Sequence, residues 1–81
     1  MIEIDKKLLY LIDLLIFNKR VSSIADFCDE ISMRPQNITK IKNGNCHFTV
    51  EQIYNIIEKF AVNPNWVFSD DSNIFNGLRK K

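Results

Sequence analysis

The chain has 81 residues, of which 46% are hydrophobic and 26% are charged, with only two glycines and two prolines. This length allows one domain with a modest core, and the small number of backbone-breaking residues favours helices over sheets. The 11 basic and 10 acidic residues give a formal net charge of +1, so net charge alone does not indicate a nucleic-acid partner. We therefore expect one all-α domain over residues 1–81.

The two cysteines, Cys28 and Cys46, are too few for a disulfide framework and do not have metal-ligand spacing. Free thiols on a chain without a signal sequence predict a reducing, cytoplasmic setting. The apolar run from Leu8 to Phe17 is broken by Asp13 and is too short to cross a bilayer. We expect no metal, no cofactor, no small-molecule substrate and no membrane association.

The first helix is predicted over about Asp5–Asn18, because its apolar residues recur with helical spacing. One stripe on this helix has the i, i+3, i+4, i+7 pattern of a core-facing surface. Its residues are Leu8, Leu11, Ile12 and Leu15. A second apolar stripe lies nearly opposite and consists of Tyr10, Leu14 and Phe17. This second stripe requires a cover, which is either the C-terminal segment or another subunit.

Two short helices are predicted next. Ser23 is a good N-cap for a helix that ends near Ile31, with Asp26 at its third position. Pro35 suits the first position of the following helix, which runs to Lys42 and is stopped by residues 43–44, Asn-Gly.

The fourth helix has a capping box, formed by Thr49 and Gln52, and Phe48 precedes it at the position of a hydrophobic staple with Ile53. Residues 63–64, Asn-Pro, open a short fifth helix in which Trp66 is expected to fill the core. The tail, about residues 70–81, has apolar side chains that are able to dock. We expect one core formed by Leu8, Leu15, Phe27, Ile31, Ile38, Ile41, Ile53, Ile57 and Trp66.

The second and third helices, over about residues 23–43, have the sequence form of a helix-turn-helix. Ile38 and Ile41 share one face of the third helix, and the opposite face carries amides and a lysine, which are side chains that read base edges. The segment Ile31–Thr49 contains basic residues and no acid. Such a local basic face suits a compact DNA-binding domain, although a solvated surface is the alternative.

These elements resemble a known family. Residues 23–44, SIADFCDEISMRPQNITKIKNG, resemble the helix-turn-helix of lambda-repressor-like, Cro-type DNA-binding domains. The similarity continues to residues 63–68, NPNWVF, which resemble the N-P-x-W-L-L-T-G-E-G element that closes many phage and bacterial repressor domains. The resemblance covers about residues 5–75. It implies a compact four- to five-helix bundle, homodimeric binding to double-stranded DNA, and transcriptional control as a repressor.

By this resemblance, the helix Pro35–Lys42 enters the major groove. The implied base contacts are Pro35, Gln36, Asn37, Thr39 and Lys40. The implied phosphate contacts are Ser22, Ser23, Asn43, Asn45 and His47. Arg34 and Lys42 are expected to contact phosphates or to be plain surface residues.

Three positions depart from the family pattern. Ile24 stands where a glutamine often braces the recognition helix, and Ser32 stands at a turn position that is commonly glycine. Ser32 must therefore adopt an unusual backbone conformation for a residue with a Cβ atom. Residues 69–72, Ser-Asp-Asp-Ser, replace the T-G-E-G element.

The chain has no Ser-His-acid set, no glycine-rich phosphate loop and no convergent carboxylate pair, so we do not expect an enzyme. The alternative to a DNA-binding regulator is a protein-interaction module, or an antitoxin-like regulator with the same fold. A homodimer is expected because one such domain reads few base pairs. Its candidate interface residues are Tyr10, Leu14, Phe17, Ile74, Phe75 and Leu78, which meet either within one chain or across two.

Overall fold

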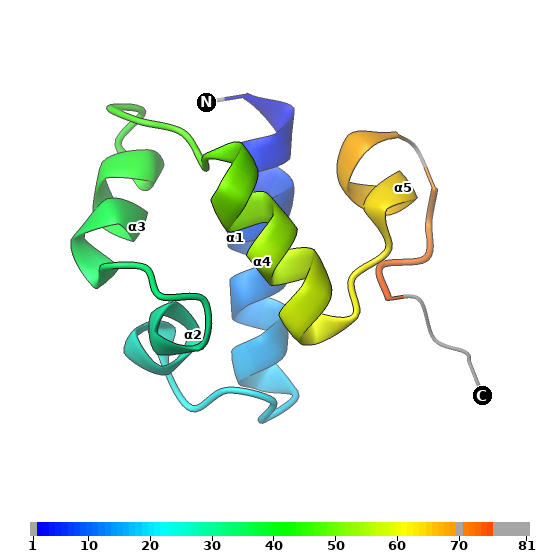
Figure 1. Ribbon diagram of the computed structural model, residues 1–81, viewed down its shortest axis with the longest axis horizontal. Helices are drawn as coiled ribbons and strands as arrows, with labels where there is room; N and C mark the ends of the chain where they lie inside the picture. The colour runs from blue at the N-terminus through cyan, green and yellow to red at the C-terminus, as the bar shows by residue number, and fades with distance from the viewer. Residues whose placement is uncertain (1, 70, 76–81) are drawn as a thin grey trace.

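The computed structural model describes residues 2–69 and 71–75, and this part of the chain forms five helices and one isolated β-bridge (Figure 1). The helices are α1 (Glu3–Phe17), α2 (Ile24–Glu30), α3 (Pro35–Lys42), α4 (Val50–Phe60) and α5 (Pro64–Phe68). The prediction of an all-α bundle is confirmed. None of the helices in the described ranges is long and apolar enough to cross a membrane.

The predicted starts of α2 and α4 are confirmed by their capping hydrogen bonds. The Ser23 hydroxyl accepts a hydrogen bond from the backbone N–H of Asp26 at 3.2 Å, at the start of α2. Both bonds of the capping box at α4 are present: the Thr49 side chain accepts from the Gln52 N–H at 3.1 Å, and the Gln52 side chain accepts from the Thr49 N–H at 2.9 Å. Helix α1 begins earlier than predicted, at Glu3.

The core lies between α1 and the other helices. Eight of the nine predicted core residues are buried, and Ile57 is only partly buried at the edge. The rings of Phe27 in α2 and Phe60 in α4 stack with centroids 5.3 Å apart, which connects α2 to α4.

The end of α5 is held by a side chain from α1. The Lys7 ammonium donates hydrogen bonds to the backbone carbonyls of Trp66 at 2.8 Å and Ser69 at 2.7 Å. A cation near the C-terminus of a helix is stabilised by the carbonyls that have no partner within the helix. Lys7 thus stabilises the turn that follows α5.

The described part of the tail, residues 71–75, runs beside the segment between α4 and α5 (Figure 1). Phe75 forms a β-bridge with Val62, and the Ile74 carbonyl accepts a hydrogen bond from the Asn63 N–H at 2.8 Å. Ile74 and Phe75 are partly buried against the core. Leu78 lies outside the described residues.

The second stripe of α1 is not covered by this tail. Tyr10 is 55% exposed and Phe17 is 81% exposed. Of the two alternatives left open by the sequence, contact of the stripe with Ile74 and Phe75 within one chain is not the arrangement of the described residues, because those tail residues pack at the bridge with Val62.

Candidate nucleic-acid interface

The turn between α2 and α3 has the sharp geometry that the sequence implied. Ser32 has φ 57°, in the left-handed region, as expected for a residue at a position commonly occupied by glycine. The Met33 N–H then donates to the Cys28 carbonyl at 2.9 Å, which closes the end of α2. Met33 is itself buried, so the turn anchors α3 to the core.

Helix α3 has one buried face and one open face. Ile38 and Ile41 are each 1% exposed and hold the helix on the core. Of the five predicted base-contact residues, four are exposed and Asn37 is half-buried. The exposed ones are Pro35, Gln36, Thr39 and Lys40. The structure therefore brings these residues together on a single accessible surface.

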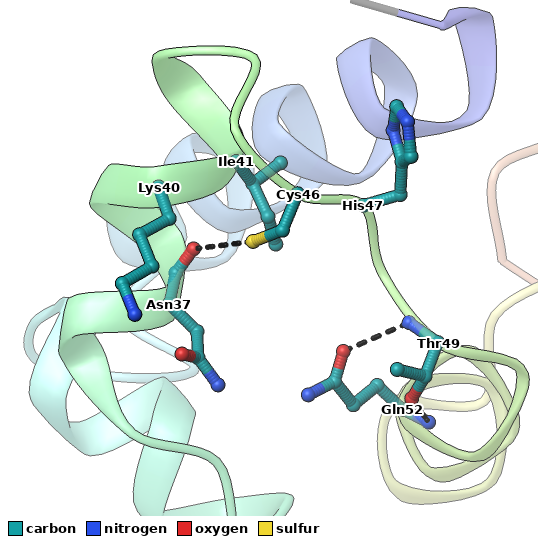
Figure 2. Close-up of a pocket in the computed structure, with 7 residues that line it drawn as sticks. All are labelled: Asn37, Lys40, Ile41, Cys46, His47, Thr49 and Gln52. Atoms are coloured by element: carbon teal, nitrogen blue, oxygen red, sulfur yellow. Dashed lines mark hydrogen bonds between the residues drawn. The ribbon is translucent and has the colours of Figure 1, made fainter.

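A groove of about 260 Å³ lies between α3 and the start of α4 (Figure 2). Asn37 and Lys40 line its α3 side, and Gln52 lines its α4 side. The Cys46 thiol lies at its upper end and donates a long hydrogen bond, 3.9 Å, to the Asn37 carbonyl. The groove thus combines side-chain donors from two helices beside the exposed face of α3.

Gln52 is a further candidate for contact with DNA, although its sequence position predicted only a role in the capping box of α4. Its side-chain oxygen is occupied by the Thr49 N–H, whereas its amide nitrogen is directed toward α3 (Figure 2). The residue type could have indicated this role from the sequence, because a glutamine in a capping box retains an NH₂ group for an external acceptor and a glutamate does not.

Six of the seven predicted phosphate contacts fall into two groups. The first group lies around the two ends of α3 and is exposed throughout, with side chains that are able to donate hydrogen bonds: Arg34, Lys42, Asn43 and Asn45. Gly44, with φ 80°, reverses the chain after α3, and the Asn45 N–H donates to the Lys40 carbonyl at 2.8 Å. This loop is therefore held close to the end of α3.

The second group, Ser22 and Ser23, is already engaged within the protein. The N–H and hydroxyl of Ser22 both donate to Oδ2 of Asp26, at 2.9 and 3.3 Å. A carboxylate beside these hydroxyls repels a phosphate. Ser22 and Ser23 are therefore the least suited of the predicted phosphate contacts, and Asp26 was expected from its position only to stabilise the first turn of α2.

His47 also has an internal partner. Its Nδ1 lies 2.6 Å from Oδ2 of Asp5, and its ring is directed toward α1 (Figure 2). The second oxygen of Asp5 accepts from the Phe48 N–H at 3.2 Å. Asp5, only 1% exposed, was not singled out from the sequence because an acid in the first turn of a helix is common.

Metal binding and nucleophilic chemistry have little support among the residues that the structure describes. No group of three or more His, Cys, Asp or Glu residues is placed there to hold a metal ion. Burial raises the pKa of the Cys28 thiol, and the nearby Asp29 carboxylate raises it further. Such a thiol stays protonated at neutral pH, which is the opposite of what a nucleophile requires.

Comparison of the chain with protein-family models, curated proteins and solved structures finds no match.

Proposed function

We propose that this protein binds double-stranded DNA sequence-specifically and acts as a transcriptional regulator of the phage or bacterial repressor type, with α3 in the major groove. One observation carries the proposal: the amide and lysine side chains of α3 share an accessible face, while Ile38 and Ile41 fix the opposite face in the core. A helix anchored in this way presents its polar side chains in a rigid array, which sequence recognition requires.

The side chains on this face suit base recognition. Asparagine and glutamine pair in a bidentate manner with adenine, and lysine donates to the O6 and N7 atoms of guanine. Gln36 and Asn37 lie at the start of α3, which is the end that contacts base edges in helix-turn-helix complexes. Lys40 lies one turn further along, beside the groove shared with Gln52.

The charge around α3 supports binding to a polyanion. Residues 31–49 contain no acid, and Arg34 and Lys42 are exposed at opposite ends of α3. Attraction of these cations to phosphates supplies affinity without sequence preference, and the amides and Lys40 supply the preference. Occupation of an operator would then repress transcription by excluding other proteins from the same DNA.

Selection of bound sequences from a random DNA pool tests the proposal. We expect an enriched motif, and we expect Asn37→Ala and Lys40→Ala each to lose roughly 1–3 kcal/mol of preference for it. Lys6→Ala is the matched control, because Lys6 is an exposed lysine on α1 outside the α3 surface. If no motif is enriched and the protein does not bind generic DNA at low salt, the result would favour the protein-interaction alternative.

A further inference from the structure

A second groove, of about 250 Å³, lies on the side of α4 that faces α5. Val50, Tyr54 and Phe68 border it and are 84%, 60% and 57% exposed. Ile53 and Ile57 form the remainder of its lining, so all five lining residues are aliphatic or aromatic. We call these five residues the α4–α5 face. Contiguous exposed apolar side chains of this kind mark interaction sites.

One edge of this face is acidic. Glu51 and Glu58 are exposed on α4, and each directly follows a lining residue, Val50 or Ile57. Seven positions make nearly two helical turns, so the two glutamates share one edge of α4, about 10 Å apart along its axis. Successive residues are about 100° apart around a helix, which puts both glutamates next to Tyr54, on the side away from the core. Among the described residues, neither glutamate forms an ion pair.

The cations of the neighbouring elements leave this acidic edge uncompensated. Lys59 is the lysine of α4, and the helical period puts it on the side of α4 opposite the groove. Lys7 reaches α5 from α1, but its ammonium is held by the carbonyls of Trp66 and Ser69, at 2.8 and 2.7 Å. The α4–α5 face therefore combines an apolar groove with a net negative edge.

The size and lining of the groove favour a peptide side chain as its occupant. Its volume is below the roughly 300–1,000 Å³ of small-molecule sites, and its lining has few polar groups to orient such a ligand. An apolar groove between two helices receives the apolar side chains of an amphipathic helix, which recur at i, i+3, i+4 and i+7. Two carboxylates nearly two turns apart match lysine or arginine side chains at the same spacing.

We propose that the α4–α5 face binds a cationic amphipathic helix of a partner protein. Apolar side chains of the partner fill the groove, and its lysine or arginine side chains lie beside Glu51 and Glu58. Burial of the apolar side chains supplies affinity, and the charged edge selects and orients the partner. A second copy of this chain matches the face less well, because it brings two more carboxylates to the same contact.

The position of the face leaves α3 free. In Figure 1, α3 lies at one side of the molecule, α5 lies toward the other, and α4 lies between them. Gln52 lines the groove between α3 and α4, whereas Tyr54 lines the groove between α4 and α5. A helix bound at the α4–α5 face therefore does not cover the α3 surface, and the proposal does not depend on DNA binding.

A synthetic amphipathic helix of about four turns, roughly 14 residues, tests the proposal. The lysine probe carries leucines at helical spacing on one face and lysines along both edges of that face. The glutamate probe has the same leucines, with glutamates in place of the lysines. Fluorescence anisotropy of the labelled probes measures their binding to the full chain. We expect the lysine probe to bind, and the glutamate probe to bind about tenfold more weakly or less, because its charges repel the acidic edge.

Substitutions in the chain assign the binding to this face. Glu58→Lys should weaken binding of the lysine probe about three- to tenfold and strengthen binding of the glutamate probe, because it reverses one charge of the edge. Asp13→Lys is the matched control: it changes the net charge equally at an exposed position of α1, and it should bind both probes like the wild type. Tyr54→Ala should weaken the lysine probe about tenfold or more, because it removes an aromatic side chain from the groove. Circular dichroism verifies that each variant remains helical.

Four results would overturn the proposal. The lysine probe could fail to bind, or Glu58→Lys and Asp13→Lys could affect it equally. Sedimentation could show that the wild type associates with itself and that the lysine probe dissociates it, which would assign the face to a second copy. Finally, Leu78→Ser could strengthen binding of the probe, which would assign the groove to the tail of the chain. Binding of the lysine probe with the expected variant effects, together with no selective DNA binding, would instead overturn the proposed function alone.

Discussion

Nδ1 of His47 lies 2.6 Å from Oδ2 of Asp5, and this contact joins the first turn of α1 to the loop that follows α3. Asp5 also accepts a hydrogen bond from the Phe48 N–H, so one buried carboxylate holds two consecutive residues of that loop. A carboxylate that is 1% exposed is tolerated because both of its oxygens have donors. The position of the α3–α4 loop thus depends on a residue near the start of the chain.

Replacement of Asp5 should destabilise the domain strongly. Asp5→Ala leaves the buried Phe48 N–H without its acceptor, and we expect a loss on the order of 2–3 kcal/mol in the free energy of unfolding. Urea denaturation measures this loss. Asp13→Ala, at an exposed acid on the same helix, should change stability by less than about 0.5 kcal/mol. Equal effects of the two changes would show that the carboxylate contacts are not stabilising.

The stack between Phe27 and Phe60 provides a second test of the fold. Phe27 is fully buried, so Phe27→Ala should cost about 3–5 kcal/mol through lost apolar contact and a residual cavity. Phe17→Ala removes the same side chain from a position that is 81% exposed, and it should be nearly neutral. Thermal unfolding compares the stability of the two variants. A small loss of stability for Phe27→Ala would contradict the burial of Phe27 in the core.

Local patterns predicted most of the helices. The bonds at Ser23 and Thr49 connect residues three positions apart, so their partners can be read directly from the sequence. The bond between Asp5 and His47 connects residues 42 positions apart, and no spacing rule relates them. The sequence therefore indicated the α3 face, which depends on helical periodicity, but it did not indicate that His47, whose side chain is 55% exposed, contacts Asp5 of α1.

The contact between Ser22 and Asp26 is local in the sequence, yet it was also not predicted from the sequence. Asp26 lies within four positions of Ser22 and was recognised as a first-turn acid, yet its carboxylate turns back to bind the Ser22 N–H and hydroxyl. Two expectations compete at the start of α2. An acid stabilises the first turn of a helix, whereas a phosphate would need the N–H and hydroxyl donors of that turn to be free. The first expectation agrees with the structure, because the Asp26 carboxylate already accepts hydrogen bonds from both donors of Ser22.

Lys42 should contribute affinity for DNA without sequence preference. It is exposed at the end of α3, next to the loop that holds Asn43 and Asn45. Lys42→Ala should weaken binding to all sequences about equally and reduce the salt slope by about 0.9, the value for one phosphate contact. Fluorescence anisotropy over a salt series measures both effects. A loss confined to the selected motif would assign Lys42 to base reading instead.

The two thiols should differ in reactivity. Burial and the Asp29 carboxylate raise the pKa of Cys28, and the reactive species is the thiolate, so Cys28 should resist alkylation at neutral pH. Cys46 is half-buried and should react first, as mass spectrometry after limited iodoacetamide treatment would show. Since the folded state disfavours the Cys28 thiolate, its contribution to stability is present below the ordinary thiol pKa and is lost as pH rises through the raised value. Cys28→Ala should flatten that alkaline decline.

Ser32→Gly should stabilise the turn between α2 and α3. Ser32 has φ 57°, and a left-handed conformation costs a residue with a Cβ atom roughly 1–2 kcal/mol. Glycine avoids this cost but loses more conformational entropy on folding, so we expect a net gain of about 0.5–1 kcal/mol. Ala25→Gly is the control, because Ala25 is exposed within α2 and glycine there should destabilise by a similar amount. Chemical denaturation measures the change in the free energy of unfolding for both variants. Destabilisation by Ser32→Gly would mean that the serine side chain stabilises the turn by more than the strain costs.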